Sequence, residues 1–481
     1  MSELNLSELK FTEIDIKNFV NSSLDVEEGS VLFINHDDKD KLDKYVDESL
    51  KKKVKLVITS LNCSSNDDKV IKAKNYSEVF LDSYNYLCND YESKKYFGIT
   101  GTNGKTTTGS YLKELLGPES LFIGTNEDEL FSEITNEKHL TSPKLFNILK
   151  LLGKSDFKKY NNIILEASSH SLDQDRFNGI RFNTSGFTNL SQDHFDYHTN
   201  IENYFNSKLK LFSNQLSDKY VYIDNEWGNK VAQNSSLPSF KISSDTQADL
   251  QILEKKTYPK TSLKIEINKK IYDFELDIVG PNFYQNFLLA FSMAYYSKIK
   301  NVDQIIENIS NLKNPKGRFD LINFKTNKII VDYAHTPESI SQVIKYVNPY
   351  FSKVVVLFGA GGNRDKEKRK LMGTASQLAD SVIVTNDNPR NEDPIQISND
   401  ILKGCDLSKT TVILDRKEAI TSAINELREN SVLLVLGKGH EMYQEINNSH
   451  IPFNDNDFIN ETIGGLIWLQ LLYLVQFLFY S

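Results

Sequence analysis

From Arg318 onward, short apolar runs alternate with stretches in which apolar residues recur at helical spacing. The runs are Lys328 to Val331, Lys353 to Phe358, Ser381 to Val384 and Ser431 to Leu436. Because parallel strands are joined by crossover helices that cover the sheet, this order indicates an α/β fold. The pattern therefore predicts a parallel sheet with helices on both of its faces.

Length and composition restrict the class of protein further. A chain of 481 residues should contain two or three packed units, with boundaries near residues 90 and 317. Its 39% hydrophobic and 25% charged residues are typical of a soluble globular protein. A net charge of −9 argues against a protein that coats nucleic acid. The three cysteines are widely spread, which excludes a disulfide framework and a cysteine-cluster metal site and fits a reducing cytoplasm.

The segment 463–481 is uncharged and largely apolar. It is at the short limit for a membrane-spanning helix of about 20 residues, and two glutamines interrupt it. A buried C-terminal helix and a shifted reading frame are the other interpretations that its composition leaves open. We expect no stable membrane insertion, and the first residues show no pattern of a secretory signal.

Residues Gly101 to Thr107 read Gly-Thr-Asn-Gly-Lys-Thr-Thr and lie between a predicted strand, Lys95 to Thr100, and a predicted helix, Lys105 to Leu116. Backbone N–H groups of such a turn can cradle phosphates, its lysine can reach the outer phosphates, and the next threonine can ligate Mg²⁺. The full P-loop would have glycine where Ile99 stands, so this is a shortened phosphate loop. The pattern predicts a nucleotide site at this strand end.

Polar clusters also follow other predicted strands, at the sheet edge where ligands of parallel sheets bind. The strand Asn162 to Glu166 ends in a carboxylate, which suits a hard cation beside nucleotide phosphates. Ser262 to Ile278 alternates apolar and polar residues and predicts an antiparallel hairpin. A lone histidine or lysine in any of these clusters would more often be structural, so only the ordered series indicates a site.

The ordered series consists of Gly101 to Thr107, Glu166 to Arg176, Asp193 to His198, Lys208, Gly317-Arg318, Asp332 to Pro337, Gly359 to Lys366, Asp387 to Arg390 and Gly437 to Glu441. With these motifs in this order, the chain resembles the Mur ligases of peptidoglycan synthesis from about residue 20 to Asp457. The resemblance is strongest to the ligases that add meso-diaminopimelate as the third residue of the stem peptide. It implies an enzyme that uses ATP and Mg²⁺, with UDP-N-acetylmuramoyl-L-alanyl-D-glutamate (UDP-MurNAc-L-Ala-D-Glu) as the acceptor of the amino acid.

The resemblance also implies an arrangement of domains. Residues 1–90 would bind the UDP substrate, 91–316 would form a central ATP-binding domain with a mostly parallel sheet, and 317–462 would form a Rossmann-like domain that brings the amino acid. The tail 463–481 matches nothing in the family pattern. We expect a monomer in the cytoplasm with small-molecule substrates and no nucleic-acid partner.

Each matching residue receives a role from the resemblance. The ATP-binding residues would be Gly101, Thr102, Asn103, Gly104, Lys105, Thr106, Thr107, Asn286, Arg318, Asp332 and His335. The catalytic residues would be Lys105, Glu166, His194 and Lys208, and the metal ligands would be Thr106, Glu166, His194 and a carbamylated Lys208. The UDP substrate would contact Ser23, Thr141, Ser142, Ser168, Gln174 and Arg176. Diaminopimelate would contact Arg364, Asp387, Asn388, Pro389, Arg390, Gly437 and Glu441.

Arg390 leads to the sharpest expectation about specificity. Diaminopimelate differs from lysine by a distal carboxylate, and a guanidinium offers a planar pair of donors that matches this group. Asp387 and Glu441 could accept from the ammonium at the same end. Lysine would leave the guanidinium unpaired, and such sites discriminate by up to ~10⁴ to 10⁵. The alternative is that Arg390 caps a helix or pairs with Glu392 or Asp393.

Three positions depart from the family pattern: Ser22-Ser23-Leu24 replaces Asp-Ser-Arg near the uridine, Thr141-Ser142 replaces Thr-Thr, and Phe283 replaces the first of two asparagines. A lysine-adding ligase or a folylpolyglutamate synthetase would share the shortened phosphate loop, but Asp387 to Arg390 argues against both. A nucleotide-regulated binding protein without chemistry is the remaining alternative. Only an enzyme would release phosphate in a way that depends on both an acyl acceptor and an amine.

Overall fold

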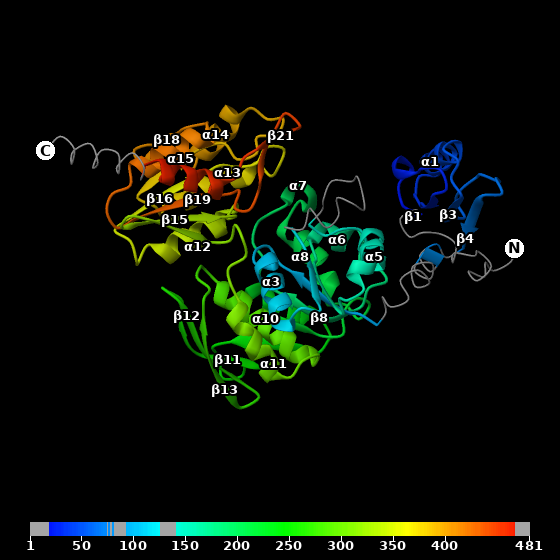
Figure 1. Ribbon diagram of the computed structural model, residues 1–481, viewed down its shortest axis with the longest axis horizontal. Helices are drawn as coiled ribbons and strands as arrows, with labels where there is room; N and C mark the ends of the chain where they lie inside the picture. The colour runs from blue at the N-terminus through cyan, green and yellow to red at the C-terminus, as the bar shows by residue number, and fades with distance from the viewer. Residues whose placement is uncertain (1–18, 75, 77–78, 81–92, 126–140, 467–481) are drawn as a thin grey trace, which may run out of the picture.

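The computed structural model describes residues 19–74, 76, 79–80, 93–125 and 141–466. Three large sheets follow one another along the chain, and a two-stranded hairpin follows the third. In Figure 1 the sheets lie in three lobes, coloured blue, cyan to green, and yellow to red. Each sheet falls within one of the predicted domains, while the boundaries at 90 and 316 stay a prediction.

The N-terminal sheet has the order β1-β2-β3-β4, and all neighbouring strands are parallel. Its strands are Phe19–Val20, Val31–Phe33, Leu56–Ser60 and Val70–Ala73. The short helix η4 (Ser23–Asp25) follows β1, and α1 (Lys39–Lys51) follows β2. Asp38 begins α1 by accepting from two backbone N–H groups, and Leu42 and Val46 bury one face of the helix.

The central sheet has the order β13-β12-β11-β10-β9-β8-β5-β7-β6. Only the β11-β12-β13 end is antiparallel, so the expected mostly parallel sheet and hairpin are both confirmed. The strands are β5 (Lys95–Thr100), β6 (Ser120–Ile123), β7 (Asn162–Glu166), β8 (Phe182–Phe187), β9 (Tyr220–Ile223), β10 (Ser239–Ser243), β11 (Leu250–Lys256), β12 (Thr261–Ile267) and β13 (Lys270–Leu276).

Helices cover both faces of the central sheet. Phe97 and Ile99 of β5 pack with α3 and α10 in one apolar cluster, whereas Tyr96 packs with α5 in another. This division follows from the alternation of side chains along a strand. The helices are α3 (Lys105–Leu116), α5 (Leu145–Gly153), α6 (Ser169–Asp173), α7 (Phe195–His198), α8 (Ile201–Leu209), α9 (Glu226–Asn234), α10 (Phe283–Ser297) and α11 (Val302–Glu307).

The C-terminal sheet has the order β14-β15-β19-β16-β17-β18 and is parallel except for the edge strand β14. Its strands are β14 (Asp320–Phe324), β15 (Asn327–Asp332), β16 (Lys353–Phe358), β17 (Ser381–Val384), β18 (Thr410–Val412) and β19 (Ser431–Leu436). Apolar clusters on both faces contain residues of α12 (Pro337–Val347), α13 (Glu367–Ser376), α14 (Pro394–Leu402) and α15 (Arg416–Asn425). The predicted parallel sheet with helices on both faces is thus confirmed, whereas the strands at its two edges, β14 and β18, were not predicted.

The chain ends its described part with the hairpin β20 (Tyr443–Ile446) and β21 (Ser449–Pro452) and a helix at 455–466. Ile463 is 7% exposed and packs into the apolar cluster on one face of the C-terminal sheet, and Leu466 packs against the same cluster. The first residues of the apolar tail therefore belong to a packed helix, and 467–481 lie outside the described residues. Within the described part of the chain, no helix is long and apolar enough to cross a membrane.

Candidate active site

The loop between β5 and α3 is shaped by close packing. Gly101 and Gly104 have φ angles of 149° and 86°, which favour glycine. A Cβ on Gly104 would lie 2.5 Å from Oδ1 of Asn286, and one on Gly101 would lie 1.8 Å from Oγ1 of Thr188. Both positions therefore need glycine, and the predicted nucleotide residue Asn286 of α10 lies directly against the phosphate loop.

Asn189, which follows β8, holds this loop in shape. Its Oδ1 accepts from the backbone N–H of Asn103 at 3.0 Å, and its Nδ2 donates to the carbonyl of Asn103 at 3.1 Å. Its own carbonyl accepts from the N–H of Thr102 at 2.9 Å. The loop is therefore preorganised by a neighbouring strand end, and Asn189 is a residue that the sequence analysis did not assign to the site.

The amines of Lys105 and Lys208 meet at one carbonyl oxygen. Nζ of Lys105 lies 3.1 Å and Nζ of Lys208 lies 2.7 Å from the oxygen of Gly101. Burial lowers the pKa of both lysines, and for Lys208, which is 1% exposed, the neighbouring Lys105 lowers the pKa further, well below its usual value. The Lys208 amine is therefore biased toward its neutral form.

Glu166 ends β7 and is 1% exposed. Its two carboxylate oxygens accept from the N–H and the hydroxyl of Thr125 at 3.0 and 3.2 Å. Its carbonyl accepts from the hydroxyl of Ser142 at 2.6 Å, and that hydroxyl oxygen accepts from the N–H of Ser168 at 2.9 Å. The predicted metal carboxylate is thus tied to the predicted contacts of the UDP substrate.

Arg176 completes this group of predicted substrate contacts. Its Nη1 donates to the carbonyl of Ser142 at 2.9 Å, and its Nε donates to Oε1 of Gln174 at 3.0 Å. Thr141 directly precedes Ser142 in the chain. Ser23 lies elsewhere, in η4 of the N-terminal lobe. The structure therefore brings together Ser142, Ser168, Gln174 and Arg176, and it leaves Ser23 on a separate lobe.

Asp193 and His194 lie where the C-terminal lobe meets the central lobe. Nζ of Lys368 on α13 donates to Oδ1 of Asp193 at 3.2 Å, and both side chains are 9% exposed. Burial alone would raise the pKa of Asp193, but Lys368, with nearby histidines, lowers it well below its usual range. Burial lowers the pKa of His194, so its imidazole is neutral near pH 7 and has a lone pair for a ligand.

Arg318 approaches the phosphate loop from the C-terminal side. Its Nη2 donates to the hydroxyl of Thr106 at 3.2 Å, and its guanidinium lies 4.5 Å from the ring centroid of Tyr333. Its Nε is buried and has no hydrogen-bond partner among the described residues. A buried donor of this kind calls for an acceptor, and a nucleotide bound at the loop would supply one.

Asp332 and His335 follow β15 on the same side. Asp332 accepts from the backbone N–H groups of Phe319 and Ala334 at 2.8 and 2.7 Å, and burial raises the pKa of its carboxyl to about 6. Nδ1 of His335 lies 2.8 Å from the carbonyl of Tyr333, and burial lowers the pKa of this histidine to about 4. The carboxyl is mostly ionised and the imidazole is neutral at pH 7.

The donor groups around the loop decide whether Mg²⁺ fits. Glu166 supplies a carboxylate, Thr106 a hydroxyl and His194 a neutral imidazole, all of which can ligate a divalent cation. The described residues contain no ready group of three acidic, histidine or cysteine side chains for a metal. An ammonium on Lys208 would repel the cation, whereas its carbamate would supply oxygen ligands. The set therefore fits Mg²⁺ once Lys208 is modified.

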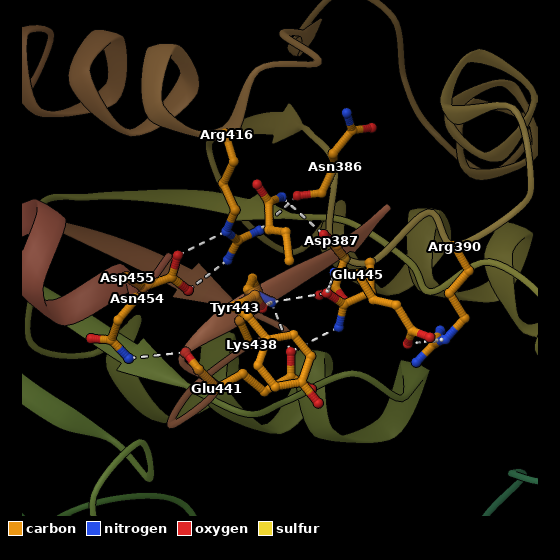
Figure 2. A network of polar contacts seen from close by, with 12 residues as sticks. Asn386, Asp387, Arg390, Arg416, Lys438, Glu441, Tyr443, Glu445, Asn454 and Asp455 are labelled. Atoms are coloured by element: carbon orange, nitrogen blue, oxygen red, sulfur yellow. Dashed lines mark hydrogen bonds and ion pairs between the residues drawn. The ribbon is translucent and has the colours of Figure 1, made fainter. Parts of the chain in front are cut away.

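The predicted amino-acid site is built from loops that follow β16, β17 and β19. A Cβ on Gly437 would lie 2.4 Å from Oδ2 of Asp387, and Nδ2 of Asn388 donates to Oε2 of Glu441 at 2.8 Å. Arg364 is exposed beside these loops. The structure thus brings together Asp387, Asn388, Pro389, Arg390, Gly437 and Glu441. Figure 2 shows Asp387, Arg390 and Glu441 within the polar network.

Lys438 lies at the centre of this network and is fully buried (Figure 2). Its Nζ donates to Oε2 of Glu441 at 2.7 Å, to Oδ1 of Asn388 at 3.1 Å and to the carbonyl of Tyr443 at 2.7 Å. Burial and the nearby carboxylate of Asp387 raise the pKa of Glu441, and Lys438 opposes this effect. Lys438 therefore orients two predicted ligand contacts and favours the ionised form of Glu441.

Arg416 holds the starts of two of these loops through hydrogen bonds to their backbone. Its Nε and Nη2 donate to the two carboxylate oxygens of Asp455, each at 2.8 Å, and neither side chain is exposed. Its Nη2 also donates to the carbonyl of Leu436 at 3.1 Å and its Nη1 to that of Asn386 at 3.3 Å (Figure 2). These two carbonyls directly precede the two motifs of the amino-acid site, so one buried cation fixes both strand ends.

Arg390 differs in one respect from the sequence-based expectation. Its Nε donates to Oε2 of Glu445 at 2.9 Å, and its Nη1 donates to the carbonyl of Gly362 at 2.9 Å. Glu392, expected as an alternative partner, instead pairs with the buried Arg369 at 2.9 Å. Because the guanidinium already has a carboxylate partner, the expectation that lysine would leave it unpaired is wrong.

Comparisons with known proteins identify the family of the chain. The Mur ligase middle domain matches residues 99–294, and the Mur ligase glutamate ligase domain matches residues 317–439. A protein of Rickettsia montanensis is 34% identical over 476 residues, which cover 95% of this chain and 98% of that protein. The chain belongs to the Mur ligase family. The Rickettsia relative is named UDP-N-acetylmuramoyl-L-alanyl-D-glutamate–2,6-diaminopimelate ligase, as is an Aquifex aeolicus protein that is 32% identical over 95% of this chain and 96% of its own.

Solved structures extend the comparison to the fold. A structure of UDP-N-acetylmuramoyl-L-alanyl-D-glutamate–2,6-diaminopimelate ligase matches with a TM-score of 0.65 at 26% identity, over 97% of this chain and 99% of that one. MurF of Thermotoga maritima, solved in complex with ADP, matches with a TM-score of 0.62 at 16% identity, over 89% and 95% of the chains. At 16% identity, the second comparison supports the fold alone. Both comparisons agree with the predicted α/β fold.

In this Mur ligase, five residues to which the sequence analysis gave no role hold the site in place. They are Asn189, Lys368, Arg416, Lys438 and Glu445. A signal existed for Lys438, because a lysine between two glycines directly after a continuous apolar strand is placed at a buried strand end. The pairing of Arg416 with Asp455 joins residues far apart in sequence and had no such signal.

Proposed function

We propose that this chain is the ATP-dependent ligase that joins meso-diaminopimelate to UDP-MurNAc-L-Ala-D-Glu in peptidoglycan synthesis. Relatives named for this ligation match it over nearly its whole length. The structural observation that carries the proposal is the amino-acid site. There, Asp387 and Glu441 supply acceptors and Arg390 supplies donors within one group of loops, which suits an amino acid with an ammonium and a carboxylate at its distal end.

The reaction has two steps. A carboxylate oxygen of D-glutamate attacks the γ-phosphorus of ATP, the bond to ADP breaks, and an acyl phosphate forms. The amine nitrogen of diaminopimelate then attacks the acyl carbon, the bond to phosphate breaks, and the nitrogen loses a proton as the amide forms. Phosphorylation is needed because an unmodified carboxylate has only a poor leaving group.

The chain's own residues supply positioning and charge neutralisation. The backbone N–H groups at the start of α3 cradle the phosphates, and Lys105 and Arg318 offset their negative charge. Thr106, Glu166, His194 and carbamylated Lys208 would hold Mg²⁺, which neutralises phosphate charge when bound. The Lys368–Asp193 pair keeps the lobes together, so the amine is aligned and water is excluded from the acyl phosphate.

A substrate matrix tests the proposal. The protein is incubated with ATP, Mg²⁺ and UDP-MurNAc-L-Ala-D-Glu, together with meso-diaminopimelate, L-lysine, L-glutamate or no amino acid. Phosphate release is measured, and the product is identified by mass spectrometry. We expect phosphate release to require both the UDP substrate and an amino acid, with meso-diaminopimelate strongly preferred.

The same matrix separates the alternatives. Preference for L-lysine would identify a lysine-adding ligase. Phosphate release in a further reaction, in which a folate with L-glutamate replaces the UDP substrate and its amino acid, would identify a folylpolyglutamate synthetase. Nucleotide binding without substrate-dependent phosphate release would identify a binding protein that has lost the chemistry. The cytoplasmic location and the monomeric state remain predictions that fractionation and light scattering would check.

A further inference from the structure

The backbone of Arg390 is held in an uncommon conformation. Its φ of 52° lies in the left-handed region, which residues other than glycine, asparagine and aspartate seldom adopt. The backbone is fixed from both sides, because the N–H of Arg390 donates to the carbonyl of Glu445 and the N–H of Asn447 donates to the carbonyl of Arg390, each at 2.9 Å. Such strain persists only where the surroundings determine the conformation, and it is typical of ligand sites.

The guanidinium of Arg390 is fixed as well. Nε donates to Oε2 of Glu445 on β20, and Nη1 donates to the carbonyl of Gly362 in the loop after β16, each at 2.9 Å. These two acceptors define the plane of the guanidinium. A guanidinium has five N–H donors in a rigid plane, and these two contacts use only two of them. The Nη1 and Nη2 ends retain the donors that a second carboxylate needs for paired hydrogen bonds.

Glu445 is itself anchored to the amino-acid site. Its backbone N–H donates to Oδ1 of Asn388 at 3.0 Å, and that oxygen also accepts from the buried Lys438. The side chain of Glu445 is 14% exposed and that of Arg390 is 20% exposed, so the pair is largely removed from solvent. Gly361 leaves room for the arginine, because a Cβ there would lie 2.9 Å from Nη1.

We propose that Glu445 is a positioning residue that determines specificity for diaminopimelate by orienting Arg390. This inference rests on the proposed function and adds a residue to it. Glu445 holds the guanidinium by Nε, so that its outer edge faces the distal carboxylate of the amino acid in the orientation needed for paired hydrogen bonds. The charge of Arg390 is already balanced by Glu445 when no ligand is bound. The higher affinity for diaminopimelate therefore arises from the alignment of the guanidinium donors with its distal carboxylate.

Two substitutions of Glu445 separate orientation from charge. Glu445→Gln would keep an oxygen acceptor for Nε of Arg390 and remove the negative charge, whereas Glu445→Ala would remove both. If orientation is the role, Glu445→Gln should stay close to the wild type. If Glu445 instead competes with the substrate carboxylate for Arg390, both substitutions should tighten the binding of diaminopimelate.

The experiment compares Glu445→Ala and Glu445→Gln with the wild type under saturating ATP and UDP substrate. We expect Glu445→Ala to raise KM for meso-diaminopimelate about 10- to 100-fold, the effect of a lost hydrogen bond to a charged group, with kcat within about threefold. Glu445→Gln should raise this KM by less than about fivefold. KM for ATP should stay unchanged in both variants, and Glu429→Ala, which removes an exposed glutamate of the same lobe, should match the wild type.

A double-mutant cycle ties the effect to Arg390. In an Arg390→Ala background, Glu445→Ala should cause little further change in KM for diaminopimelate, because the group that it orients is absent. Additive effects, an unchanged or lowered KM in Glu445→Ala, or equal losses in the alanine and glutamine variants would each overturn the proposal. If the wild type does not use diaminopimelate, the proposed function and this inference both fail, whereas failure of the inference alone leaves the wild-type activity intact.

Discussion

Nζ of Lys368 lies 3.2 Å from Oδ1 of Asp193, so a buried ion pair joins α13 of the C-terminal lobe to the loop after β8 of the central lobe. Asp193 directly precedes His194, one of the proposed metal ligands. The contact therefore relates the position of the amino-acid site to that of the phosphate site. A pair of this kind contributes mainly by orientation, because the desolvation of two charges offsets much of their attraction.

Lys368→Met should lower kcat for ligation at least about tenfold, because it leaves Asp193 buried without its cation and weakens the contact between the lobes. Asp193→Asn should have a similar effect, and the double variant should cost little more than either single variant. Steady-state kinetics with all three substrates provides the measurement. Lys230→Met, which removes a more exposed pair with Glu202, serves as the control and should leave kcat unchanged. Additive losses would contradict the pairing.

Gly104→Ala should abolish ATP binding while the protein remains folded. The new methyl group would lie 2.5 Å from Oδ1 of Asn286 at a φ of 86°, so the phosphate loop would have to move. Gly29→Ala is a matched control, because Gly29 has a similar φ of 85° but open space around its Cβ position. Calorimetric titration with a nucleotide should show normal binding by the control. The positive φ should lower the free energy of unfolding of the control by about 1 kcal/mol. Normal binding by Gly104→Ala would refute the packing argument.

The sequence predicted those parts of the molecule that depend on the local spacing of apolar residues and glycines. The β5–α3 turn, the strand that ends at Glu166 and the four parallel strands after Arg318 are all found where periodicity and glycine placement put them. The edge strands β14 and β18 were missed because their pairing with β15 and β17 depends on the assembled sheet more than on their own sequence pattern. The partner of Arg390 was missed for a related reason: Glu445 reaches it only through the β20 hairpin, whose position depends on tertiary packing.

Arg416→Met should destabilise the protein by about 3 to 5 kcal/mol, because it leaves Asp455 buried and unpaired and frees two carbonyls. Asp455→Asn should also destabilise the protein. Urea unfolding would measure both changes. The matched control is Arg181→Met, since Arg181 and Asp218 form an exposed pair whose loss should cost at most about 1 kcal/mol. Equal effects at the buried and exposed pairs would contradict this account.

Asp332 should give the protein a defined dependence of stability on pH. Its pKa is about 6 in the folded protein, above the usual 3.8, so the folded state holds its proton more tightly than the unfolded state does. The resulting stability is fully present below about pH 4 and is lost as pH rises through 6, with a total of about 3 kcal/mol. Asp332→Asn cannot ionise. The unfolding free energy of the wild type should therefore fall relative to that of the variant from pH 4 to 6.5, and the difference should stay constant above pH 7. A difference that is constant over the whole range would contradict the raised pKa.

Lys208 should react with CO₂. Lys208 is 1% exposed, and its pKa is lowered by burial and by Lys105, so its neutral, nucleophilic form is more accessible than that of an exposed lysine. The nitrogen would bond to the carbon of CO₂ and lose a proton, which replaces a cation beside the phosphate loop with an anion that can ligate Mg²⁺. Mass spectrometry under native conditions should detect the added CO₂, and depletion of CO₂ should reduce activity reversibly.

Lys208→Ala should be nearly inactive, and short carboxylic acids that occupy the vacated space should restore part of the activity, because they return a carboxylate to the same position. The control is Lys210→Ala, since Lys210 lies two residues away, is 42% exposed, and contacts the carboxylates of Asp173 and Asp175 and the carbonyl of Asp173. It should retain normal activity and gain nothing from added acids. An active Lys208→Ala enzyme without additives would refute the carbamate, while the ligase proposal would still rest on the amino-acid site and its substrate matrix.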